Sequence, residues 1–260
     1  MAKKPEPLTS FEYANLKPGK TAIFLDFDGT LADFAEHPDA VSVPLPTRDV
    51  LARLEKSTGG ALAIITGRPI QEIDRFLAPL HLPVAGVHGL ERRNAGGERS
   101  AVSVEAGDFT RLKEKLQPFT EANPGTMIET KAGSLALHYR QRPELEEESA
   151  AAVHDAVDGL AGLQILQGKM VVEVKSGKAT KADAVSAFMA EPPFRGRLPL
   201  FAGDDVTDED AFGAIAEHGG ISIKIGSGAT VARLRADTTD AFRDWLAILA
   251  DSFDTKQLTA

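Results

Sequence analysis

The chain has 260 residues, a length typical of one large domain or two small ones, and we expect two. It is 43% hydrophobic and 26% charged, which is typical of soluble globular proteins and excludes collagen-like, low-complexity and disordered chains. The net charge of −9 would repel a polyanion, so no nucleic-acid partner is expected. Cysteine is absent, which excludes thiolate catalysis and Cys-ligated metals but leaves hard ions with oxygen ligands open.

No segment of the sequence resembles a membrane-spanning or secretory segment. The first 20 residues lack the apolar run of a signal peptide, and no stretch approaches about 18 consecutive apolar residues. We therefore expect a cytoplasmic protein without a membrane partner. The sequence does not indicate an oligomeric state.

The two ends of the chain carry the alternation of strands and helices that is typical of a parallel sheet. Near the N-terminus, apolar runs and helical spacing predict strands over 21–27, 61–66 and 83–87 and helices over 47–60 and 69–80. After residue 180 they predict helices over 180–190, 208–217 and 242–249 and strands over 198–203 and 221–226. Helices covering a parallel sheet are the expected architecture.

The middle third has a different pattern. Residues 126–140 predict a hairpin joined around 131–134, a helix is expected over 143–159, and residues 163–175 predict a second hairpin turning at Gly168. Hairpins imply antiparallel pairing. We therefore predict an α/β core formed by 1–100 and 177–260, with an α+β domain of residues 101–176 inserted into it.

Acidic residues follow the first apolar strand, in the position where parallel sheets bind ligands. Asp26 and Asp28 alternate along extended backbone, so both can face one site, and Gly29 allows a sharp turn. Two carboxylates in different environments can divide nucleophilic and acid–base roles. An ordinary Asp-Gly turn is the alternative. A calcium loop does not fit, because Leu31 and His37 stand where that loop needs Gly and Glu.

Two later positions could contact an anion. The Thr66 hydroxyl and the Gly67 N–H follow a strand end and could reach an anionic oxygen, although Thr66 could instead cap the next helix. Lys181 lies near a helix start, where the helix dipole disfavours a cation, so a nearby anion would explain it. A solvated surface lysine is the alternative, and Lys175 or Lys178 could take the same role.

A second acidic group follows the predicted strand over 198–203. The like charges of Asp204, Asp205 and Asp208 repel one another unless a cation or hydrogen bonds stabilise them. Magnesium fits, since it favours one or two carboxylates, retained waters and a substrate phosphate. The alternative is a set of acids at a helix N-terminus.

The segments DFDGTL, TGR, a lysine before a helix, and GDDVTDED, in this order, resemble the haloacid dehalogenase (HAD) superfamily of phosphotransferases. The resemblance implies a HAD-like parallel-sheet Rossmannoid core, and the inserted domain looks like the α/β cap of its sugar phosphatases. It implies that Asp26 is the nucleophile, Asp28 the general acid–base, Thr66 a hydrogen-bond donor to the phosphate, and Lys181 the neutralising cation. The implied magnesium ligands are Asp26, Asp204 and the Asp28 carbonyl, with Asp205 and Asp208 in outer positions.

Most of residues 20–245 is similar to the trehalose-6-phosphate phosphatases. The matching segments are GVHGLERR, IETKAGSLALHYR and VVEVKSGKATKADAV. One departure is Ala182, where the family usually has Gly after the catalytic lysine. The resemblance implies glucose contacts from Glu129, Lys131, Arg140 and Glu173, with Gly67, His88 and Gly89 near the cleft.

The spacing within the inserted domain agrees with a sugar-binding face. The i, i+2 pairs Glu129 with Lys131, His138 with Arg140, and Glu173 with Lys175 are each expected to share one face of a strand. A polyhydroxylated sugar needs such polar faces. The solvent-exposed face of any antiparallel sheet would show the same alternation of charged residues.

The expected function is magnesium-dependent hydrolysis of trehalose 6-phosphate to trehalose and phosphate in trehalose biosynthesis, through an aspartyl-phosphate intermediate. Another sugar phosphatase or a phosphomutase with the same core is the nearest alternative. A catalytically silent magnesium-dependent binding or regulatory module is the non-enzyme alternative. Residues 226–230, GSGAT, lack the full dinucleotide-binding glycine pattern and are expected to form a loop.

Overall fold

The structure is a computed structural model that divides the chain into two compact units. Unit 1 comprises residues 1–100 and 180–260, and unit 2 comprises residues 101–179. The described residues are 4–13, 16–33, 41–101, 106–131, 133–160, 162–177 and 179–258, without the side chains of 106, 107, 131, 257 and 258. None of the helices in these ranges has both the length and the apolar character needed to cross a membrane.

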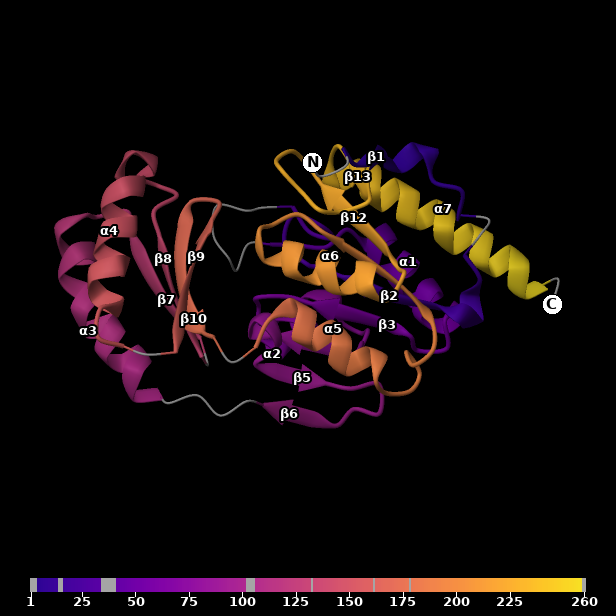
Figure 1. Cartoon of the computed structure of the whole chain (residues 1–260), viewed down its shortest axis with the longest axis horizontal. Helices are drawn as coiled ribbons and strands as arrows, with labels where there is room; N and C mark the ends of the chain where they lie inside the picture. Colours follow the sequence, from indigo (N-terminus) through magenta and orange to yellow (C-terminus); the bar gives the residue numbers. More distant parts are fainter. Residues whose placement is uncertain are drawn as a thin grey trace. The chain divides into compact units, whose positions relative to one another are not determined.

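Unit 1 is built on a nine-stranded sheet of order β1-β13-β12-β11-β2-β3-β4-β5-β6 (Figure 1). Pairing is parallel from β1 through β4, and β5 runs antiparallel to β4. This arrangement confirms the parallel sheet that the sequence predicts. The strands are β1 Glu6–Pro7, β2 Thr21–Leu25, β3 Leu62–Ile65, β4 Val84–Gly86, β5 Glu91–Arg93, β6 Arg99–Ala101, β11 Leu198–Gly203, β12 Ile221–Ile225 and β13 Leu234–Ala236.

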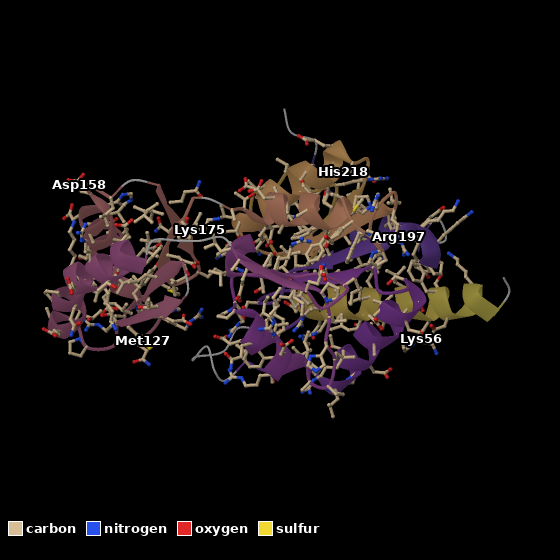
Figure 2. The ribbon with its side chains drawn as sticks, turned by 90° about the horizontal axis from the view of Figure 1, so that it is seen from below. Lys56, Met127, Asp158, Lys175, Arg197 and His218 are labelled. Atoms are coloured by element: carbon tan, nitrogen blue, oxygen red, sulfur yellow. The ribbon has the colours of Figure 1, made fainter. Side chains whose placement is uncertain are left out.

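Helices cover both faces of this sheet, as the layers in Figure 2 show. Side chains alternate along β2, so Ile23 and Leu25 pack in one apolar cluster while Ala22 and Phe24 pack in another. The first cluster includes residues of α1, α2 and α7, and the second includes residues of α5 and α6. The helices are α1 Leu45–Ser57, α2 Ile70–Leu77, α5 Lys181–Met189, α6 Thr207–Glu217 and α7 Thr239–Leu258.

Unit 2 is an antiparallel sheet of order β7-β8-β10-β9 with two helices. Both predicted hairpins are confirmed by the pairing of β7 with β8 and of β9 with β10. Leu135, Leu137, Val172 and Val174 lie on one face and pack with residues of both helices. The elements are α3 Ala106–Ala122, β7 Met127–Lys131, β8 Ser134–His138, α4 Glu146–Val157, β9 Leu163–Gly168 and β10 Val171–Ser176.

Helix α3 is the largest element for which the sequence analysis made no prediction. Phe109, Leu112 and Leu116 recur at helical spacing and are buried in the unit 2 core, so the periodic signal was present. Pro118 lies inside the helix and weakens the local signal, since proline removes an intrahelical hydrogen bond. The last helix, expected over 242–249, extends over Thr239–Leu258.

Candidate functional site

Three adjacent parallel strands bring polar residues to one edge of the unit 1 sheet. Asp204 follows β11, Asp26 follows β2, and Thr66 follows β3, and these strands are neighbours in the order β11-β2-β3. The Asp26 N–H donates to the Ala202 carbonyl at 2.9 Å, which continues the strand pairing into the site. Carboxyl ends of parallel strands meet at the same edge, so residues from distant parts of the sequence are brought together there.

Lys181 is the lysine that reaches this edge. It is the first residue of α5, and its Nζ donates to Asp26 Oδ1 and to Asp208 Oδ1, each at 2.7 Å. Burial alone would lower the pKa of Lys181, but Asp208 and Asp26 raise it above its usual value. Lys175 instead donates to the Ala179 carbonyl at 3.1 Å, and Lys178 lies outside the described residues.

Asp26, Asp204 and Asp208 form a buried acidic cluster. Each offers one carboxylate oxygen, and these oxygens lie within 4.8 Å of one another. Burial raises the pKa of Asp26 well above its usual range, and repulsion from Asp208 and Asp204 adds to this while Lys181 opposes it. Three carboxylates and the Lys181 ammonium carry a formal charge of −2 when ionised. A hard divalent cation with oxygen ligands fits this donor set.

Two glycines let the acidic loops approach one another. Gly29 has a φ of +77°, and a Cβ there would lie 2.4 Å from Asp204 Oδ2. At Gly203, a Cβ would lie 2.3 Å from the Asp208 carboxyl carbon. Any side chain at either position would displace a carboxylate of the cluster, so both glycines are required by close approach. Asp208 also holds the loop locally, because its Oδ2 accepts from the Asp205 N–H at 2.8 Å.

Asp28 is held by an arginine that the sequence analysis did not single out. Arg68 Nε and Nη2 donate to the two carboxylate oxygens of Asp28 at 2.7 and 2.8 Å, a bidentate pair. Arg68 Nη1 also donates to Glu72 Oε2 at 2.8 Å, and the guanidinium carbon of Arg68 lies 5.1 Å from the Phe76 ring centre. The arginine of the TGR segment was the available signal for this contact. The pair fixes the orientation of the Asp28 carboxylate.

Thr66, Gly67 and His88 lie together beside these acids. The Thr66 hydroxyl accepts from the Arg68 N–H at 3.1 Å, and the side-chain cap that Thr66 could have provided for α2 is not formed. The His88 N–H donates to the Thr66 carbonyl at 2.9 Å, and a Cβ on Gly67 would lie 2.7 Å from His88 Nε2. Val87 and His88 both have positive φ, at 47° and 55°, as does the following Gly89 at 100°. Positive φ is uncommon for residues other than glycine, and strained backbone of this kind clusters at active sites.

The second face of the unit 2 sheet carries charged side chains, with the apolar Met127, Val171 and Leu166 among them. In register across the strands, Glu129 lies beside Ala136, which lies beside Glu173. Their side chains therefore share the face opposite the one that packs on α3 and α4. His138 Nε2 lies 2.9 Å from Glu129 Oε2, and the exposed Arg140 donates to the Lys169 carbonyl at 3.3 Å. The next row holds Lys131, whose side chain is outside the described residues, and Lys175.

The profile of one family, described as trehalose-phosphatase, matches residues 24–241, which include both acidic loops and all of unit 2. The chain belongs to this family. A probable trehalose-phosphate phosphatase of Sinorhizobium fredii is 44% identical over 235 residues, covering 88% of this chain and 87% of that protein. The trehalose-6-phosphate phosphatase of Escherichia coli is 38% identical over 252 residues, covering 97% of this chain and 94% of that protein.

Two solved structures have a similar fold. The C-terminal domain of a C. albicans trehalose-6-phosphate phosphatase superposes with a TM-score of 0.82 at 22% identity, covering 90% of this chain and 93% of that one. A haloacid dehalogenase-like hydrolase from B. subtilis superposes with a TM-score of 0.60 at 14% identity, covering 89% of this chain and 99% of that one. At these identities the likeness concerns the fold, and it confirms the HAD-like α/β class. As a member of the trehalose-phosphatase family, the chain is a phosphoric monoester hydrolase.

Proposed function

We propose that this enzyme hydrolyses trehalose 6-phosphate to trehalose and phosphate in trehalose biosynthesis, with magnesium as its cofactor. The observation that carries the proposal is the buried contact of Asp26 with Lys181 at 2.7 Å, in a chain 38% identical to a trehalose-6-phosphate phosphatase over nearly its whole length. A carboxylate at this edge of the sheet can attack a phosphoryl group, and an ammonium beside it can stabilise the charge on the phosphate oxygens. The substrate is therefore a small sugar phosphate.

Magnesium would be held by Asp26, Asp204 and the backbone carbonyl of Asp28, with Asp205 and Asp208 outside them. The formal charge of −2 within the buried cluster and its oxygen donors support this assignment. When bound, the ion supplies positive charge that stabilises the transferring phosphoryl group. Asp208 fits an outer role, because its oxygens already accept hydrogen bonds from Lys181 and the Asp205 N–H.

The reaction would proceed by two in-line displacements. In the first, an Asp26 oxygen forms a bond to phosphorus while the bond to the sugar oxygen breaks, and Asp28 gives that oxygen a proton. In the second, water attacks the aspartyl-phosphate, Asp28 takes a proton from the water, and Asp26 is released. The Thr66 hydroxyl, the Gly67 N–H and Lys181 would bind phosphate oxygens. Arg68 would fix the direction in which Asp28 presents its carboxyl group.

We further propose that residues 1–100 and 177–260 form the catalytic core and that residues 101–176 form the cap that recognises the sugar. The charged side chains on the second face of the unit 2 sheet support this division, because carboxylates accept from sugar hydroxyls and cationic side chains donate to them. Glu129, Lys131, Arg140 and Glu173 would contact glucose, with His88 and Gly89 near the same substrate.

A phosphate-release screen over a panel of sugar phosphates, with and without magnesium, tests this function. Trehalose 6-phosphate is expected to be hydrolysed fastest. Glucose 6-phosphate should react far more slowly, because it lacks the second glucose and so cannot form the polar contacts proposed for that ring. Comparable rates on both would favour a general sugar phosphatase. Transfer of phosphate within the sugar without its release would indicate a phosphomutase, and no turnover would indicate a binding module.

Cap variants are expected to change substrate choice and to spare the chemistry. Glu129→Ala and Glu173→Ala should each lower kcat/KM for trehalose 6-phosphate by roughly tenfold or more, as a lost contact of about 1–3 kcal/mol implies. Hydrolysis of p-nitrophenyl phosphate should change much less, because it needs only the core. Glu147→Ala, at an exposed position in α4, is the matched control. Equal loss of both activities in the two variants would contradict sugar recognition by these residues.

A further inference from the structure

Lys224 is a buried lysine that the proposed mechanism does not use. It lies in β12, opposite Gly203 of β11, and is 5% exposed. The other residues of β12 alternate in the usual way, with Ile221, Ile223 and Ile225 in the apolar cluster on one face. Lys224 therefore points to the face that α6 covers. A buried ammonium is costly unless it is paired and hydrogen-bonded, so its contacts identify its role.

The Lys224 ammonium contacts the backbone of the loop that carries the acidic cluster. Its Nζ donates to the Asp204 carbonyl at 2.5 Å and lies 3.5 Å from the Asp205 carbonyl. On the other side of the same peptide, the Asp205 N–H donates to Asp208. The loop is thus held from two sides at the residue that presents the Asp204 carboxylate. The hydrogen bonds of the ammonium therefore go to the backbone of the loop, whereas the Glu209 carboxylate lies 3.8 Å away.

Glu209 links this lysine to the GSGAT segment. Its Oε1 lies 3.8 Å from Lys224 Nζ, and its Oε2 accepts from the Thr230 hydroxyl at 3.1 Å and the Val231 N–H at 2.8 Å. The Glu209 carboxylate is therefore fixed by residues after β12 and faces the ammonium. It offsets part of the cost of burying Lys224 and keeps its side chain directed at the loop. The segment that resembles a nucleotide-binding motif thus takes part in fixing the acidic loop.

We propose that Lys224 is a positioning residue, which holds the peptide between Asp204 and Asp205 and so orients the Asp204 carboxylate toward magnesium. This inference rests on the proposed function, because it takes Asp204 to be a metal ligand. Lys224 would affect magnesium binding in two opposite ways. Its positive charge repels a nearby cation, whereas its hydrogen bonds pre-organise a ligand for that cation. Replacing Lys224 therefore weakens magnesium binding if positioning dominates and strengthens it if charge repulsion dominates.

The test is magnesium titration of the metal-free full-length protein by calorimetry, with Lys224→Met and Lys224→Arg. If Lys224 acts by positioning, Lys224→Met should weaken magnesium binding on the order of tenfold, the usual effect of losing a partner of a metal ligand. If charge repulsion dominated, the same variant would bind magnesium more tightly. Lys224→Arg keeps the charge but presents a planar group, so any loss of affinity there comes from positioning.

Hydrogen exchange gives a second measurement without metal. In Lys224→Met, amides of residues 204–208 should exchange faster than in the unaltered protein, because the loop loses its carbonyl anchor. The control is Lys175→Met. Lys175 is another buried lysine that donates to a backbone carbonyl, but it lies in unit 2. Its replacement should leave both the magnesium affinity and the exchange of residues 204–208 unchanged.

Unchanged or tighter magnesium binding in the Met variant, with unchanged exchange, would overturn the role of Lys224. If the Met variant does not fold, Lys224→Arg decides: weaker magnesium binding supports the inference and unchanged affinity overturns it. Failure of the unaltered protein to bind magnesium would instead overturn the magnesium assignment in the proposed function, and this inference with it.

Discussion

Asp26→Asn is expected to lower kcat for trehalose 6-phosphate on the order of 10⁵-fold or more, a loss typical of removing a catalytic nucleophile. Asparagine has nearly the same shape as aspartate but lacks the anionic oxygen that would attack phosphorus. The fold should survive, because Lys181 keeps its contact with Asp208 and because burial already disfavours the charge on Asp26. Phosphate release and the thermal unfolding temperature of the metal-free protein would be measured together.

Two variants separate a nucleophile from a merely nearby acid. With p-nitrophenyl phosphate, whose leaving group needs no proton, Asp28→Asn should accumulate a phosphate adduct, because water activation is impaired while Asp26 remains. A peptide map by mass spectrometry should place the adduct on Asp26. Asp26→Asn should form no adduct. Asp33→Asn, an exposed acid shortly after the same strand, is the control and should behave like the unaltered protein. Near-normal turnover in Asp26→Asn would eliminate the proposed mechanism.

Removal of divalent cations is expected to abolish phosphate release, and added magnesium should restore it. Without a cation, the buried carboxylates of Asp26, Asp204 and Asp208 repel one another and the incoming phosphate, and Lys181 alone leaves a formal charge of −2. Uncatalysed phosphate-monoester hydrolysis is among the slowest reactions that enzymes accelerate, by up to ~10²¹-fold, so loss of this electrostatic contribution should be severe.

The metal-removal experiment needs a check on both the fold and the metal. Circular dichroism before and after EDTA treatment should be unchanged, because the two apolar clusters of unit 1 do not include the acidic residues. Asp204→Asn should raise the magnesium concentration needed for half-maximal activity. Full activity after chelation, with elemental analysis proving the absence of divalent metal, would contradict the magnesium requirement.

The elements of the core could be predicted because each has a strong local pattern. Strand β11, Leu198–Gly203, matches its predicted range. Strand β3 is one residue shorter than predicted at each end, and β2 and β12 end two residues and one residue earlier than predicted. Apolar runs of strand length bounded by glycine and acidic residues carry this information within a few residues. Helix α3 was missed because its interior proline interrupts an otherwise regular pattern.

The sequence by itself therefore determined the α/β class, the inserted antiparallel unit, the strand-end acids and, through the order of its motifs, the family. Residue spacing alone left Lys175, Lys178 and Lys181 open, and the resemblance implied Lys181. The tertiary structure places Lys181 against Asp26, 155 residues away. The tertiary structure also revealed that Arg68 binds Asp28 across 40 residues and that Lys224 anchors the Asp204 loop across 20. Periodicity and turn chemistry are local properties, whereas these contacts depend on which strands become neighbours in the sheet. That order is set by packing of the whole unit, and the spacing of residues along the chain does not contain it.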